Sequence, residues 1–183
     1  DTKGVRGVDM TLHRLLIAGE NWQPVVEGLG SGDAACTDAA GNFYYSDVRG
    51  APGIFCLGVD GTRTKVGEEA ASGLKFGPDG RLYGCLGAKK HIFALELSSG
   101  AMEVIVRDVQ PNDFVITNRG HIYFTETGKK QVTFVDVKEK AVRIVDTDRI
   151  PLVLRAVGIV QEDIEEPREH EFLRVEPVLG ALL

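Results

Sequence analysis

The chain lacks the features that mark several common classes of protein. No run approaches the ~18 apolar residues that a membrane-spanning helix needs. The net charge is −6, and no basic stripe is present to meet the phosphates of a nucleic acid. After Asp1 there is no charged start followed by an apolar stretch, so we expect no signal peptide in the chain. These absences predict a soluble protein, cytoplasmic or exported, without a membrane or nucleic-acid partner.

Cysteine is also scarce. The three cysteines are Cys36, Cys56 and Cys85, and the four histidines form no visible arrangement with them. Neither a Cys-x-x-Cys spacing nor a nearby histidine cluster suggests zinc. A catalytic thiol would need a histidine or a helix N-terminus to lower its pKa. We therefore interpret the cysteines as buried, unreactive thiols.

What the chain does contain is an internal repeat. The segments DAAGNFYYSD, GPDGRLYGC and TNRGHIYFTE share one pattern, and their marker glycines are Gly41, Gly80 and Gly120. The spacings between these glycines are 39 and 40 residues. A period of about 40 residues indicates an array of supersecondary units.

Each repeat unit is predicted to contain four short strands. An inner strand begins eight residues before the marker glycine, which gives the segments Asp33–Thr37, Ser72–Phe76 and Asn112–Ile116. After the glycine come an aromatic strand, a third strand, turn residues and a fourth strand. Four short strands bounded by turns are typical of a propeller blade, so we predict an all-β fold, a β-propeller of four-stranded blades. The alternative is an antiparallel sandwich with coincidental spacing, and the agreement of all four strands in three units argues against it.

The repeat divides the chain into three regions. We predict an N-terminal segment at residues 1–32 with a possible ring-closing strand, three blades at 33–148 and a divergent acidic tail at 149–183. A divergent fourth blade is the alternative interpretation of the tail. Propellers usually close with about four to eight blades, so three blades indicate a fragment of a propeller. An open blade face and free strand edges favour self-association.

Candidate functional residues lie where the inner strands begin, because the first strand of each blade lines the central channel. The residues there are Asp33, Ser72, Asn112 and Asp113. An Asp and an Asn at equivalent positions of different blades supply oxygen ligands, which suit a hard cation such as calcium. The alternative is that these residues serve only the turns, since Asp, Ser and Asn form local hydrogen bonds there.

All three repeats resemble a known family, the first through its similarity to the family's Glu-Gly-Pro…Gly-x-x-Tyr-Phe-Ser-Asp opening blade. The run VQPNDFV, followed by GHIYFT, is similar to the regucalcin/gluconolactonase (senescence-marker-protein-like) family, which shows Pro-Asn-Asp and then Gly-x-x-Tyr-Phe-Thr-Asp. The preceding unit, ASGLKFGPDGRLY, is similar to the Asn-Gly-Leu…Asp-Gly-Arg-Leu blade of that family. The resemblance covers roughly residues 12–148.

The resemblance implies a six-bladed propeller, of which about three blades are present, with one divalent cation in the channel. Such proteins hydrolyse sugar lactones and related esters, and the metal polarises the ester carbonyl and helps to generate hydroxide. Asn112 matches the Asn of Pro-Asn-Asp, and Asp33 falls where the family has a Glu, so these two are the expected metal ligands. Ser72 and Asp113 are the expected substrate-binding residues. The third and fourth family ligands have no match.

We therefore expect a calcium-dependent hydrolase of sugar lactones or related esters that is incomplete in this chain. With two of four ligands, calcium affinity should fall in about the millimolar class. The alternative is a non-catalytic propeller module that binds a sugar or a protein partner.

Overall fold

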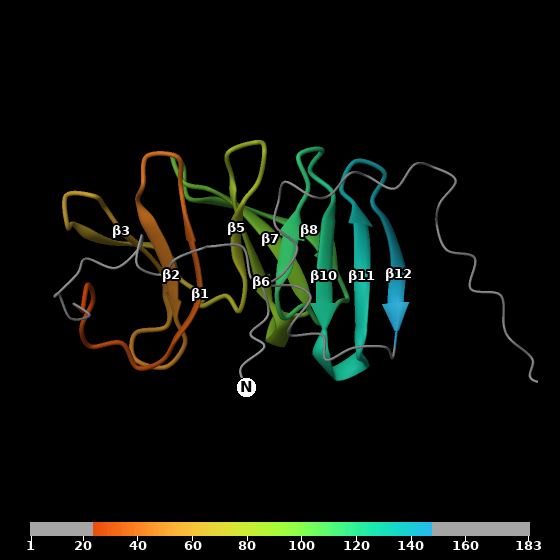
Figure 1. Ribbon diagram of the computed structural model, residues 1–183, viewed down its shortest axis with the longest axis horizontal. Coiled ribbons are helices and arrows are strands. Elements are labelled where there is room, and N and C mark those ends of the chain that lie inside the picture. Colours follow the sequence, from red (N-terminus) through yellow and green to blue (C-terminus); the bar gives the residue numbers. More distant parts are fainter. Residues whose placement is uncertain (1–23, 148–183) are drawn as a thin grey trace, which may run out of the picture.

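Three four-stranded sheets follow one another along the described part of the chain, residues 24–147 of the computed structural model (Figure 1). In each sheet the strands are antiparallel and adjacent in chain order. The predicted all-β, propeller-type architecture is confirmed. None of the described residues belongs to a helix that is long and apolar enough to cross a membrane. The predicted acidic tail at 149–183 and most of the segment 1–32 lie outside the described residues.

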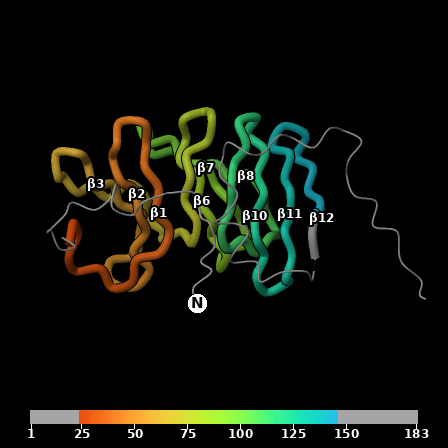
Figure 2. The backbone as a smooth tube through the Cα atoms, viewed as in Figure 1, coloured from red at the N-terminus to blue at the C-terminus, as the bar shows by residue number. Residues whose placement is uncertain are grey.

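The three sheets are called the first, second and third blades. The first blade contains β1 (Gly32–Thr37), β2 (Phe43–Asp47), β3 (Gly53–Leu57) and β4 (Arg63–Gly67). The second blade contains β5 (Leu74–Phe76), β6 (Leu82–Leu86), the short 3-10 helix η2 (Gly87–Lys89), β7 (His91–Glu96) and β8 (Ala101–Arg107). The third blade contains β9 (Phe114–Ile116), β10 (Ile122–Glu126), η3 (Thr127–Lys129), β11 (Gln131–Asp136) and β12 (Ala141–Thr147). Figure 2 follows the same path as a tube and shows one blade after another.

The marker glycines have a local conformational cause. Gly41, Gly80 and Gly120 have φ angles of +87°, +79° and +86°. Each closes the turn between the inner strand and the next strand, as when the Gly41 N–H donates to the Asp38 carbonyl at 3.1 Å. Only glycine takes this left-handed conformation without a steric cost. The glycine of the repeat is therefore required by the turn between the first two strands of every blade.

Two inner strands are shorter than predicted. β5 and β9 begin at Leu74 and Phe114, two residues after the predicted starts. Backbone pairing does continue before β5: the Ser72 N–H donates to the Cys85 carbonyl, and the Cys85 N–H donates to the Gly73 carbonyl, both at 3.0 Å. This irregular pairing interrupts the ladder. The channel-facing residues therefore precede regular strand in these two blades.

The hydrophobic core lies between neighbouring blades. Large side chains of the second blade pack on both of its faces: Leu82, Phe93 and Leu95 toward the first blade, and Tyr83 and Ile92 toward the third. The partners from the other blades are mostly aromatic or branched: Tyr44, Ile54, Phe114, Ile122, Phe124 and Val135. Blades packed face to face hold the inner strands β1, β5 and β9 next to one another.

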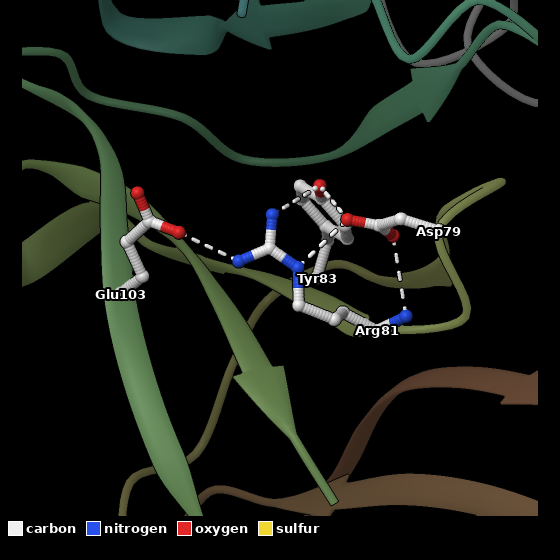
Figure 3. A network of polar contacts seen from close by, with 4 residues as sticks. All are labelled: Asp79, Arg81, Tyr83 and Glu103. Carbon is white, nitrogen blue, oxygen red and sulfur yellow. Dashed lines mark hydrogen bonds and ion pairs between the residues drawn. The ribbon is translucent and has the colours of Figure 1, made fainter.

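A polar network ties the second blade together at the end where β5 turns into β6 (Figure 3). The Arg81 guanidinium binds Asp79 Oδ2 at 2.7 Å and Glu103 Oε2 at 2.6 Å. The Tyr83 hydroxyl donates to Asp79 Oδ2 at 2.9 Å. Burial and this carboxylate raise the pKa of Tyr83 to about 12. The network connects the β5–β6 turn to the outer strand β8.

The cysteines lie in strands, and the expected burial holds for Cys85 but not for Cys36 and Cys56, which are half-buried. Cys36 lies in β1, Cys56 in β3 and Cys85 in β6, and all three are free thiols. Burial raises the pKa of Cys36 to about 11 and that of Cys85 well above its ordinary value. A raised pKa keeps a thiol protonated and poorly nucleophilic.

Candidate channel-end site

A cavity of about 720 Å³ opens at the end of the blades where the inner strands begin. Asp33, Ser72 and Asn112, one from each blade, all line it. Asp33 is the second residue of β1, whereas Ser72 and Asn112 precede β5 and β9 by two residues. The structure therefore brings three of the four predicted site residues to one cavity. Their roles toward a cation or a substrate stay predictions.

Asp113, the fourth predicted residue, is half-buried and partly engaged with the backbone. Its Oδ1 accepts the N–H of Phe114 at 2.8 Å, and its carbonyl accepts the N–H of Thr125 at 2.9 Å. Its negative charge is nevertheless close enough to act on Asp33, where partial burial and Asp113 together raise the pKa of the Asp33 carboxyl. Burial and the negative charge of Asp113, which comes from another blade, therefore disfavour the charged form of Asp33.

The backbone of Asn112 is held from both sides. Its N–H donates to the Thr125 carbonyl at 2.8 Å, and its carbonyl accepts the Ser72 hydroxyl at 2.6 Å. The preceding Pro111 is buried and has a fixed φ angle. None of the described residues hydrogen-bonds the side-chain amide of Asn112. This amide therefore stays available to a ligand in the cavity.

Two cavity carboxylates were missed in the sequence. Glu68 and Glu69 lie in the connection between the first and second blades and line the same cavity. Glu69 Oε2 pairs with Lys89 Nζ at 2.6 Å, and Glu68 Oε2 pairs with Lys65 Nζ at 2.6 Å. The only sequence signal was their position just before the inner strand of the second blade. Asp33, Glu68 and Glu69 are acidic and Lys89 is basic among the lining residues, but both glutamates are paired with lysines, so Asp33 is the cavity carboxylate without an ion pair among the described residues.

Other carboxylates near the cavity are occupied by the protein itself. Glu126, at the end of β10, is buried and accepts the Gln110 N–H at 2.8 Å, the Thr133 hydroxyl at 2.9 Å and the Lys129 ammonium at 2.8 Å. Burial would raise its pKa, but these donors and the Gln131 amide outweigh that effect and lower it. Asp47, at the equivalent end of β2, accepts backbone N–H groups from Gly30, Ser31, Arg49, Gly50 and Ala51. Both carboxylates fix loops around the cavity.

The donor set suits a hard cation in chemistry but is small in number. Asp33 and Asn112 offer one carboxylate and one amide oxygen, which are ligand types that calcium prefers, but calcium takes about six to eight oxygens. Among residues 24–147, no group of three His, Cys, Asp or Glu side chains is close enough together to hold a metal. The family resemblance would place its third and fourth ligands after Asp148, where the sequence has no match and where the residues lie outside the described part of the chain.

Comparison with known proteins shows similarity in structure only. No protein-family model and no curated protein matches the chain. A protein assigned as a gluconolactonase is 16% identical with a TM-score of 0.61, over 73% of this chain and 55% of that one. A gluconolactonase from Xanthomonas campestris is 16% identical with a TM-score of 0.56, over 63% and 47%. Virginiamycin B lyase from Staphylococcus aureus is 17% identical with a TM-score of 0.53, over 64% and 42%.

These similarities support a propeller fold of the type found in gluconolactonases and virginiamycin B lyases. The chain spans about half the length of the neighbours that it matches. At 15–17% identity such neighbours establish the fold and leave the chemistry to the residues of this chain.

Proposed function

We propose that the chain belongs to a gluconolactonase-type, regucalcin-like propeller whose channel-end cavity binds a hard divalent cation, most readily calcium, and hydrolyses sugar lactones or related esters. One observation carries the proposal: Asp33 and Asn112, from the first and third blades, line one cavity. The structural similarity to two gluconolactonases supports the same assignment.

Each cavity residue has a role in this proposal. Asp33 and Asn112 would hold the cation through a carboxylate and an amide oxygen. The nearby carboxylate of Asp113 adds attraction for positive charge. A bound cation of this kind supplies Lewis-acid polarisation of the ester carbonyl and an acidic bound water. Asp113 lies beside Asn112 and contacts the substrate side of the site, whereas the Ser72 hydroxyl is engaged with the Asn112 carbonyl. In the net reaction, water adds its oxygen to the carbonyl carbon, the ring C–O bond breaks, and a hydroxy acid forms.

Calcium titration calorimetry of the whole chain tests the proposal directly. We expect weak binding, in about the millimolar class, because the described residues supply two side-chain ligands. Asp33→Asn should abolish it, and Asn112→Ala, which keeps the carboxylate of Asp33, should weaken it. Asn118→Ala is the matched control, since Asn118 lies exposed in the turn before the marker glycine at the other end of the same blade. Binding that survives both site variants would overturn the assignment, and micromolar affinity would mean that further ligands exist.

A second candidate function is a non-catalytic propeller module that binds a sugar or a protein. The small number of ligands in the described residues favours it. Under this alternative the chain binds a sugar lactone without turning it over, and binding does not depend on calcium. A lactone hydrolysis assay with and without added calcium, run beside Asn112→Ala, separates the two functions.

A further inference from the structure

One hydrogen bond crosses from the second blade to the third at the cavity. The Ser72 hydroxyl donates to the Asn112 backbone carbonyl at 2.6 Å. The two residues occupy equivalent positions in successive repeats, eight residues before Gly80 and Gly120. A serine hydroxyl has a single proton to donate. Because that proton goes to Asn112, Ser72 does not offer it to a ligand in the cavity.

The two blades approach closely around this bond. A Cβ atom at Gly73 would lie 2.8 Å from Asp113 Oδ1 and 3.2 Å from the Asp113 Cα. A Cβ atom at Gly87 would lie 2.7 Å from the Pro111 carbonyl oxygen. Only glycine fits at either position without a shift of the neighbouring blade. The segment that contains Asn112 is therefore packed directly against the backbone of the second blade.

We propose that Ser72 is a positioning residue for Asn112. It acts through the Asn112 carbonyl, and by fixing this peptide it holds the Asn112 side chain toward the cavity. At the equivalent position the first blade has Asp33. The three repeats therefore supply one cation ligand (Asp33), one residue that positions a ligand (Ser72) and a second cation ligand (Asn112). This role replaces direct substrate contact for Ser72. Its effect on cation binding rests on the proposed function, whereas its effect on the Asn112 side chain does not.

The first test needs no ligand. Nitrogen-15 NMR of the whole chain, at a concentration where light scattering shows one species, follows the Asn112 side-chain amide and the Asp113 backbone amide. In Ser72→Ala we expect the Asp113 amide signal to shift and the Asn112 side-chain amide to become more mobile. Ser72→Thr, which keeps the hydroxyl, should retain the wild-type signals. Ser98→Ala is the matched control, because its hydroxyl binds only Glu96 of its own turn. An Asn112 side chain that is unaffected by Ser72→Ala refutes the inference.

The second test uses calcium and a double-mutant cycle. Ser72→Ala should weaken calcium binding by roughly three- to tenfold, the range that one hydrogen bond supplies. Ser72→Ala combined with Asn112→Ala should bind no more weakly than Asn112→Ala alone. Additive losses would show that Ser72 contacts the cation itself and would overturn the positioning role. A wild-type chain that binds no calcium would refute the proposed function, and the NMR result would then decide the role of Ser72 alone.

The fold of each variant is checked by its melting curve. A purely structural role for Ser72 would lower the melting temperature without mobilising the Asn112 amide. If Ser72→Ala does not fold, Ser72→Cys takes its place, since a thiol is similar in size and a weak donor. In that variant the same two signals should change in the same direction.

Discussion

Removing the hydroxyl of Ser46 should destabilise the contact between the first and second blades. The Ser46 hydroxyl oxygen accepts the N–H of Ala71 at 2.9 Å, and both residues are fully buried. The equivalent positions between the second and third blades hold Cys85 and Pro111. Proline has no N–H to satisfy. Between the first and second blades, Ser46 therefore supplies an acceptor for the buried N–H of Ala71. Between the second and third blades, Pro111 has no N–H that would need one.

The magnitude follows from the group that is left behind. Ser46→Ala leaves the Ala71 N–H buried without an acceptor, which costs about 1–3 kcal/mol. For a folded region of this size, that loss corresponds to a fall in Tm of roughly 4–12 °C. Urea unfolding followed by far-UV circular dichroism gives the midpoint and the m-value. We expect a lower midpoint at an unchanged m-value, which is the signature of a pure stability change.

A double substitution makes the prediction sharper. Ala71→Pro removes the donor that Ser46→Ala orphans, so the pair should cost less than the sum of the two single variants. Ser98→Ala, an exposed serine in the second blade, should stay within about 0.5 kcal/mol of wild type. Strict additivity of Ser46→Ala and Ala71→Pro, or a Ser46→Ala variant as stable as this control, would refute the reasoning.

Three further outcomes are expected. Glu126→Ala should destabilise the protein by about 2–3 kcal/mol because the buried Thr133 hydroxyl loses its acceptor. The folded pKa of Glu126 lies below its ordinary value, so the stability that Glu126 contributes is present above the unfolded pKa and is lost as pH falls through the folded pKa. The free energy of unfolding of Glu126→Gln should therefore change less over this acid range than that of the wild type. Lys140→Gly should stabilise by about 0.5–1 kcal/mol in urea unfolding, because Lys140 has a φ of +51° and glycine takes this conformation freely. Ile144→Lys should reduce self-association in light scattering, because Ile144 and Val142 are exposed on the edge strand β12.

The propeller architecture could be predicted because its signals are local. The left-handed turn at Gly41, Gly80 and Gly120 requires the same residue type in every blade, and the requirement repeats at nearly the same interval. The meeting of the channel-end residues could also be predicted, although β5 and β9 begin two residues later than expected, since topology alone brings the starts of successive blades to one end of a channel. Asp33, Ser72 and Asn112 do line one cavity there.

The missed features depend on contacts between blades. Glu68 and Glu69 reach the cavity because of the path that the chain takes from β4 to β5, and no local pattern specifies that path. The partner of the Ser72 hydroxyl is a carbonyl 40 residues away. In the sequence alone Gly73 looks like a residue that ends a strand. In the structure glycine is needed there because a side chain would collide with the carboxylate of Asp113 in the next blade. The pattern within one repeat predicts the strands of that blade, but it does not predict how one blade packs against the next.

The carboxylates around the cavity differ in their hydrogen-bond partners. This difference distinguishes those that hold loops in place from one that could bind a ligand. The carboxylates of Asp47 and Glu126 accept several hydrogen bonds, and these lower the pKa of each. Such carboxylates have few lone pairs left to bind a ligand. Asp33 shows the opposite shift, since partial burial and the charge of Asp113 raise its pKa. A carboxylate whose charged form is disfavoured in this way gains from a cation nearby, and such perturbed groups concentrate at functional sites. Among these three acids, Asp33 is the one whose carboxylate accepts no hydrogen bond from the described residues, in contrast to Asp47 and Glu126.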